Sequence, residues 1–218
     1  MVDYNNFAKT FSKSRKNMKW LEMEYFMDKL NFSDNTKILD IWCGNWRFLW
    51  ELISIFSDKI NSNNYTWADL SSGLLEEARK DYSEFNFHEL NMLDIDSLED
   101  KFTDIFFFAS FHHLQNIDDR LVVLKKAFDK LETGWKIYMT NWALNSELNS
   151  KRYNSAIIEW SENEFGSLDY NIKIWEFDRY YHCFSIEELT YLFTEAWFKI
   201  IENKLFENNR NFISIIQK

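Results

Sequence analysis

Short apolar runs alternate with longer helix-like stretches along the whole chain, and this alternation constrains the fold more than any other feature. The apolar runs are typical of buried strands, and the stretches between them have the spacing of amphipathic helices. Alternation of the two favours one α/β unit, a mostly parallel sheet with helices on both faces. The expected strands are residues 37–41, 65–69, 86–90, 103–109, 136–141, 198–203 and 212–217, and the expected helices are residues 19–30, 47–56, 72–82, 118–131 and 186–195.

The sequence predicts a single domain over residues 1–218, because no linker, internal repeat or low-complexity segment divides it. Within it we expect an N-terminal helical cap over residues 1–34 and a substrate-side insertion over residues 143–180. Cys43 and Cys183 lie far apart and lack metal-ligand spacing, so we expect free thiols and no metal site. Ligands of such sheets bind beyond the carboxyl ends of the strands, near the switch in strand order.

The formal net charge of −10 means that the surface repels polyanions on average. Contact with a nucleic acid would therefore need a local basic patch or a partner protein. The chain has no apolar run of about 18 residues that could span a membrane, and its first residues lack the apolar core of a signal peptide. We therefore expect a cytoplasmic protein that binds neither membrane nor DNA.

The first expected strand ends at Asp40 and turns through Trp42, Cys43, Gly44, Asn45 and Trp46 into a helix. If the two Trp residues were Gly, the segment would read LDIGCGNG. That segment resembles the cofactor loop of class I S-adenosylmethionine-dependent methyltransferases. The resemblance implies their Rossmann-like fold, a seven-stranded sheet with an antiparallel C-terminal strand, and S-adenosyl-L-methionine as cofactor.

Three later strand ends are similar to motifs of the same family. Asp69 ends the second strand in YTWADLS and is our expected ligand of the ribose hydroxyls, at a spacing from the Gly turn that fits this role. NMLD resembles the segment that holds adenine, and ASFHHL resembles the segment that faces the methyl group. The expected cofactor-binding residues are Asp40, Trp42, Gly44, Asn45, Trp46, Asp69, Leu70, Met92, Leu93, Asp94 and Ser110.

Five Trp residues stand where this family has Gly: Trp42, Trp46, Trp67, Trp135 and Trp197. The chain has 10 Trp and only 4 Gly, whereas average usage would give about 15 Gly. Gly serves such positions because the backbone takes a positive φ or approaches the ligand closely. Our hypothesis is that the gene uses UGA as a glycine codon that is written here as Trp.

The flanking segments narrow the resemblance. The chain resembles the tRNA wobble-uridine carboxymethyl methyltransferases and the methyltransferase domain of the AlkB-like tRNA hydroxylase in several segments that occur in the same order. These segments are YNNFA with FSKSR, SFHH, WA after the fifth strand, and RYYHCF before the last helix. The resemblance implies methyl transfer to the carboxylate of 5-carboxymethyluridine in tRNA, and a small zinc-binding protein as activator. Arg15, His113, Arg179 and His182 are the expected catalytic residues that hold this carboxylate.

Two other functions stay open. One is a small-molecule carboxyl or oxygen methyltransferase, which the acidic surface would suit better than tRNA. The other takes the Trp residues literally and describes a folded pseudo-enzyme whose cofactor crevice is plugged.

Overall fold

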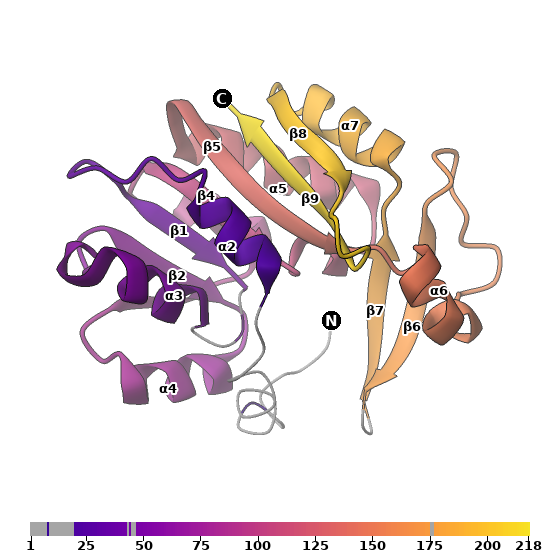
Figure 1. Ribbon diagram of the computed structural model, residues 1–218, viewed down its shortest axis with the longest axis horizontal. Coiled ribbons are helices and arrows are strands. Elements are labelled where there is room, and N and C mark those ends of the chain that lie inside the picture. Colours follow the sequence, from indigo (N-terminus) through magenta and orange to yellow (C-terminus); the bar gives the residue numbers. More distant parts are fainter. Residues whose placement is uncertain (1–7, 9–19, 43, 45–46, 175–176) are drawn as a thin grey trace.

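The computed structural model describes residues 8, 20–42, 44, 47–174 and 177–218, and it shows a central sheet covered by helices, with a smaller ribbon at one side (Figure 1). The sheet has seven strands in the order β3-β2-β1-β4-β5-β9-β8. These strands are β1 (Ile38–Ile41), β2 (Tyr65–Asp69), β3 (Asn86–Glu89), β4 (Phe102–Phe108), β5 (Leu131–Trp142), β8 (Lys199–Leu205) and β9 (Asn211–Gln217).

The sheet is parallel from β3 to β5, and β9 runs antiparallel to both of its neighbours, β5 and β8. This arrangement confirms the expected fold class, with all seven strands close to their expected places. Strand β5 begins earlier than expected, at Leu131 instead of residue 136. The reason is a register irregularity that lets Leu131 pair with Phe102 at the start of β4.

Helices cover both faces because alternate strand residues point to opposite sides. On one face, α2 (Leu21–Met27), α3 (Arg47–Phe56) and α4 (Ser72–Asp81) pack on a core that includes Ile38 and Phe106. On the other face, α5 (Ile117–Lys130), α7 (Ile186–Glu195) and the 3₁₀ segment η3 (Met92–Ser97) pack on a core that includes Leu39 and Ile105. The helices expected at 47–56 and 186–195 have the expected bounds, and α2 is shorter than expected.

A two-stranded antiparallel ribbon of β6 (Leu168–Ile174) and β7 (Phe177–Cys183) stands beside the main sheet (Figure 1). With α6 (Glu147–Tyr153) and the 3₁₀ segment η5 (Asn154–Ala156) it fills most of the expected insertion. Tyr170 and Ile172 point into a small core while Asn171 and Lys173 are exposed. These two strands were not among those expected from the sequence, although this period-2 alternation is a strand signal.

None of the helices in the described part of the chain is long and apolar enough to span a bilayer. The same residues contain no group of three or more His, Cys, Asp or Glu side chains placed to hold a metal ion. Cys183 is a buried free thiol, and Cys43 lies outside the described residues.

Candidate functional site

The carboxyl ends of β1 and β2 bring two of the predicted cofactor residues into direct contact. Asp69 ends β2, and its carboxylate accepts hydrogen bonds from the backbone N–H of Ser71 at 2.8 Å and from that of Gly44 at 3.3 Å. Gly44 has φ 67°, a left-handed conformation that suits Gly. The turn after β1 is therefore tied to the acid that ends β2. Strand β1 lies between β2 and β4, at the switch in strand order where α/β sheets bind ligands.

Asp69 is only 5% exposed. Burial raises the pKa of its carboxyl to about 7, while hydrogen bonds from Ser71 and Gly44 act in the opposite direction. Asp40, buried in the neighbouring strand, accepts a hydrogen bond from Tyr65 Oη at 2.6 Å, and its charge adds to the shift. A buried carboxylate of this kind gains from further hydrogen-bond donors, such as the two hydroxyls of a ribose.

Trp42 follows β1 in a left-handed conformation, with φ 56°. Its backbone N–H donates to Ala68 O at 2.7 Å, and its indole Nε1–H donates to Leu90 O at 3.2 Å. Leu90 follows β3 and donates its own N–H to Asp69 O. Because β2 lies between β1 and β3, the indole crosses the carboxyl end of β2. This side chain therefore covers the strand end that carries Asp69, the expected ribose ligand.

The expected adenine segment lies in η3, directly after β3. Met92 is buried, Leu93 packs half-buried against the core, and Asp94 is exposed. The Asn91 side chain accepts a hydrogen bond from Leu93 N–H at 3.1 Å, which fixes the start of this segment. Leu70, half-buried, follows Asp69 directly. The structure therefore places these four expected residues beside the carboxyl ends of β2 and β3.

Two histidines follow β4 with different hydrogen bonds. His113 is half-buried, and its Nδ1 lies 3.0 Å from Tyr180 O. Ser110, which precedes them in the same motif, is buried. His112 is buried, and its Nδ1 lies 3.2 Å from the backbone N–H of Trp142, at the end of β5. Burial lowers the pKa of His113 to about 4, and the Arg179 cation lowers it further against the hydrogen bond to Tyr180. Both rings are therefore neutral near pH 7, since burial also holds the pKa of His112 well below its usual value.

His182 belongs to a buried charge network. Its Nδ1 lies 2.6 Å from Asp169 Oδ1, and its Nε2 lies 2.8 Å from Glu188 Oε2. Arg120 donates to the other oxygen of Glu188 at 2.8 Å. Burial alone would raise the pKa of Glu188, but His182 and Arg120 hold it at about 2. Both ring nitrogens of His182 are engaged by carboxylates, and these contacts join β7 to β6 and α7.

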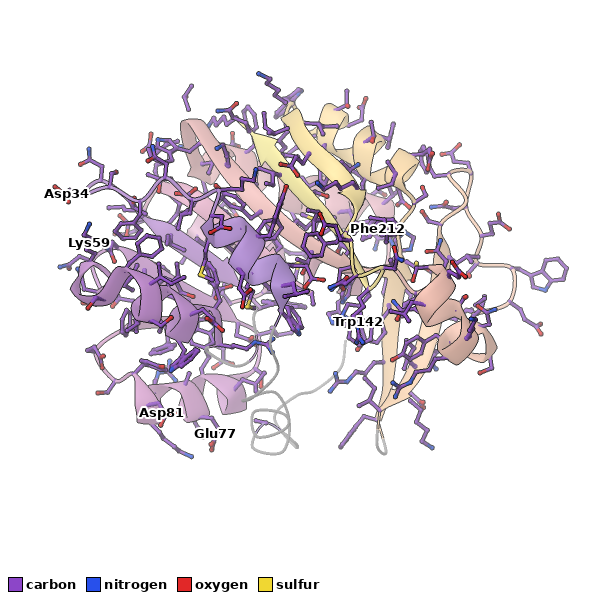
Figure 2. The ribbon with its side chains drawn as sticks, viewed as in Figure 1. Asp34, Lys59, Glu77, Asp81, Trp142 and Phe212 are labelled. Carbon is purple, nitrogen blue, oxygen red and sulfur yellow. The ribbon has the colours of Figure 1, made fainter. Side chains whose placement is uncertain are left out.

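A cavity of about 810 Å³ lies between the carboxyl end of β5 and the ribbon. Trp142 at the end of β5 is one of its walls and lies between the main body and the ribbon (Figure 2). The Trp142 ring stacks on Tyr181 of β7, with centroids 5.0 Å apart and planes at 8°. Among the described residues, the lining includes three cationic side chains and no acidic one: Arg152, Lys173 and Arg210.

Solved structures with a similar architecture include S-adenosylmethionine-dependent methyltransferases. One from Methanosarcina mazei is 22% identical, with a TM-score of 0.63 over 89% of this chain and 96% of its own. An amino pentose methyltransferase from Micromonospora echinaspora, with S-adenosylmethionine bound, is 12% identical, with a TM-score of 0.65 over 96% of both chains. This chain has the class I methyltransferase fold. A 1,6-didemethyltoxoflavin N1-methyltransferase from Burkholderia thailandensis, bound to S-adenosylhomocysteine, is 14% identical, with a TM-score of 0.62 over 91% of this chain and 76% of its own.

No family model matches the sequence, and no curated protein matches it. The methyltransferase fold is therefore recognised from the structure and from the strand-end motifs together.

Seven other predicted site residues complete this description. Asp40, Gly44 and Asp69 lie together at the carboxyl ends of β1 and β2. Arg179 is buried in β7 close enough to act on the pKa of His113. Three predicted residues lie outside the described part of the chain: Arg15, Asn45 and Trp46.

Sequence reasoning missed several residues of this region. His112 was quoted in its motif but not chosen, because which of two adjacent histidines faces inward depends on the turn after β4. The cations of the cavity come from α6, β6 and the segment before β9, which are far apart in the sequence. No spacing rule could have grouped them.

Proposed function

We propose that the chain is a methyltransferase that uses S-adenosyl-L-methionine. The observation that carries this proposal is the hydrogen bond between Gly44 and Asp69 at the switch point of a class I methyltransferase sheet. Asp69 would hold the ribose, and Met92 and Leu93 would flank the adenine. When bound, the cofactor supplies an electrophilic methyl group. The Asp69 carboxylate fits this cofactor as an acceptor for the ribose hydroxyls, but the Trp42 indole, bonded to Leu90 O, lies across the carboxyl end of β2.

We propose further that glycine stands at several of these Trp positions in the natural protein. Six described residues other than Gly have positive φ, and three of them are Trp: Trp42, Trp160 and Trp197. A bulky aromatic residue rarely adopts this conformation, which costs about 1–2 kcal/mol for an L-residue. Trp160 is 98% exposed and Trp197 is 61% exposed, so little packing offsets that cost. UGG codons at these positions would refute the recoding.

Trp67 and Trp135 lie inside β2 and β5 and are not among the residues with positive φ. For these two, the support is the family resemblance alone. Trp46 lies outside the described residues.

The acceptor that we propose is the carboxylate of 5-carboxymethyluridine at the tRNA wobble position. The cavity beside Trp142 supports an anionic, aromatic acceptor, because it combines three cations with the stacked Trp142–Tyr181 pair. These cations form the local basic patch that an acidic protein needs for RNA. A zinc-binding activator protein would supply further RNA contacts, and both proteins would act in the cytoplasm.

A carboxylate suits the neutral histidines of this site. It is already ionised near pH 7, so methyl transfer to it needs alignment and hydrogen-bond donors but no general base. With a pKa of about 4, His113 is too weak a base to activate a phenol or an amine efficiently at neutral pH.

The test is methylation of tRNA that carries 5-carboxymethyluridine, by protein with Gly at 42, 46, 67, 135 and 197. Mass spectrometry of the nucleosides should show the methyl ester, and tRNA with unmodified wobble uridine should gain no methyl group. A strain that lacks the gene should accumulate the free acid. If the ester forms equally in that strain, the tRNA proposal is wrong.

Two observations favour other functions. Trp42 lying across the crevice favours a plugged pseudo-enzyme if the codon is UGG. Solved neighbours named as amino pentose and toxoflavin methyltransferases favour a small-molecule acceptor. Titration with S-adenosylmethionine distinguishes a plugged pseudo-enzyme from a functional methyltransferase. Mass spectrometry of the tRNA nucleosides distinguishes a small-molecule methyltransferase from a tRNA methyltransferase.

A further inference from the structure

Three buried polar side chains at the carboxyl ends of β4 and β5 have atoms without hydrogen-bond partners among the described residues. These atoms are Ser110 Oγ, His112 Nε2, and both amide atoms of Asn141. All three side chains are at most 1% exposed. An unpaired buried polar group costs about 1–3 kcal/mol, and such groups are rare in folded proteins. Their accumulation at one edge of the sheet indicates that a polar ligand completes them.

Ser110 and His112 follow the end of β4, and Asn141 lies in β5, which pairs with β4. Phe108 at the end of β4 pairs with Thr140 in β5, and Ala109 N–H donates to Thr140 O at 3.1 Å and to Thr140 Oγ1 at 2.9 Å. Ser110 follows Ala109, and Asn141 follows Thr140. We call Ser110, His112 and Asn141 the orphan cluster. It adjoins Trp142, which is a wall of the cationic cavity.

The hydrogen bonds of the two histidines give them opposite tautomers. The N–H of Trp142 donates to His112 Nδ1, so in the neutral ring the proton of His112 is on Nε2. The carbonyl of Tyr180 accepts from His113 Nδ1, so in the neutral ring His113 Nε2 carries a lone pair. A carboxylate oxygen can only accept hydrogen bonds. His112 can therefore bind it through Nε2–H, and neutral His113 cannot.

We propose that His112, through Nε2–H, is the residue that binds the acceptor carboxylate, with Ser110 Oγ as a second donor. This assignment rests on the proposed carboxylate acceptor, and it moves the role expected of His113 to its neighbour. Trp142 acts as a positioning residue, because its backbone N–H fixes the tautomer of His112. The Trp142 ring, 6.1 Å from the His112 ring, is left to stack on the base.

The first test needs neither cofactor nor acceptor. Long-range ¹H–¹⁵N spectra of imidazole rings distinguish the two neutral tautomers, and the variants His112→Gln and His113→Gln assign the signals. At neutral pH, His112 should be protonated on Nε2 only, and His113 on Nδ1 only. A proton on His112 Nδ1, in either the neutral or the charged ring, would overturn the proposal.

The second test compares His112→Gln with His112→Asn in the protein with Gly at 42, 46, 67, 135 and 197. The Gln amide places an N–H near the position of Nε2, whereas the Asn amide ends near Nδ1. His112→Asn should raise the KM for the tRNA acceptor about 10- to 100-fold, the effect of one hydrogen bond to a charged group. His112→Gln should recover most of that loss, and the KM for S-adenosylmethionine should not change.

Controls separate the failure of this proposal from other failures. Melting temperature and affinity for S-adenosylhomocysteine show whether each variant folds. Ser110→Ala should also raise the acceptor KM, and it serves as the test if the His112 variants do not fold. If the unsubstituted protein methylates no carboxymethyluridine, the proposed function fails. If it methylates the tRNA and neither His112→Asn nor Ser110→Ala changes the acceptor KM, only this assignment fails.

Discussion

Replacing Trp42 by Gly and by Ala separates two effects of this side chain, the backbone strain at a positive φ and the steric block of cofactor binding. Both variants lose the hydrogen bond to Leu90 and the same packing on the core. Only Ala keeps a Cβ at φ 56°. The left-handed conformation destabilises an L-residue by about 1–2 kcal/mol, which favours Gly over Ala. The greater freedom of Gly in the unfolded chain reduces this advantage by roughly 0.4–1 kcal/mol.

The Gly variant should therefore be more stable than the Ala variant by about 1 kcal/mol. For a chain of this size, that difference raises the melting temperature by about 2–4 °C. Both variants should bind S-adenosylhomocysteine at least about tenfold more tightly than the Trp42 protein, because both clear the carboxyl end of β2. Scanning calorimetry and titration calorimetry measure the two effects separately.

Trp160 provides the matched control. It has φ 62° and is 98% exposed, so Trp160→Gly should exceed Trp160→Ala in stability by a similar amount and should leave cofactor affinity unchanged. Equal melting temperatures of Gly and Ala variants at both positions would refute the backbone argument. Equal cofactor affinity of the Trp42 protein and its variants would refute the steric argument.

Three further predictions concern ionisable side chains of the site. Asp69→Ala should weaken S-adenosylmethionine binding by about 1.5–3 kcal/mol in titration calorimetry. Because the pKa of Asp69 is about 7 and the ribose hydroxyls favour its ionised form, the affinity for S-adenosylmethionine should rise up to about tenfold from pH 6 to 8. An affinity that does not change with pH would count against this ribose site. With a carboxylate acceptor the rate should stay flat above pH 7, because His113 with a pKa of about 4 remains neutral there, and a steep alkaline rise would indicate a phenol or amine acceptor. His182→Ala should lower the free energy of unfolding in urea by about 3–5 kcal/mol, because it leaves Glu188 with one buried partner fewer, and unchanged stability would return His182 to the catalytic candidates.

The Asp104 carboxyl is a control for the pH dependence of cofactor binding. Burial also raises its pKa to about 7, but Asp104 lies near the start of β4, at the edge of the sheet opposite to Asp69. Asp104→Asn should change the pH dependence of stability and leave that of cofactor affinity as it is.

The strands of the main sheet were predictable because most are short apolar runs that end in a polar turn. The strand-end residues followed from that, since parallel strands bring their carboxyl ends to one edge. Asp69 and Gly44 lie at two of these strand ends and were singled out by their resemblance to methyltransferase motifs, whereas the hydrogen bond between them is seen only in the structure.

The ribbon and the charge network were harder to predict. In β6, Tyr170 and Ile172 alternate with polar residues over too few positions to stand out beside the stronger runs. His182 stands in a family motif that predicts a catalytic role, and its two carboxylate partners come from β6 and α7. Partners separated in the sequence cannot be read from spacing, so this charge network required the structure.

The central claim, that the chain binds S-adenosyl-L-methionine at the carboxyl ends of β1 and β2, has one direct test. S-adenosylmethionine is titrated into protein with Gly at 42, 46, 67 and 135, and into the same protein with Asp69→Ala. The account predicts saturable binding with a Kd between about 1 μM and 1 mM for the first protein, and binding about 10- to 100-fold weaker for the second. A folded Gly protein that binds no S-adenosylmethionine, or one that binds it equally well without Asp69, would contradict the account.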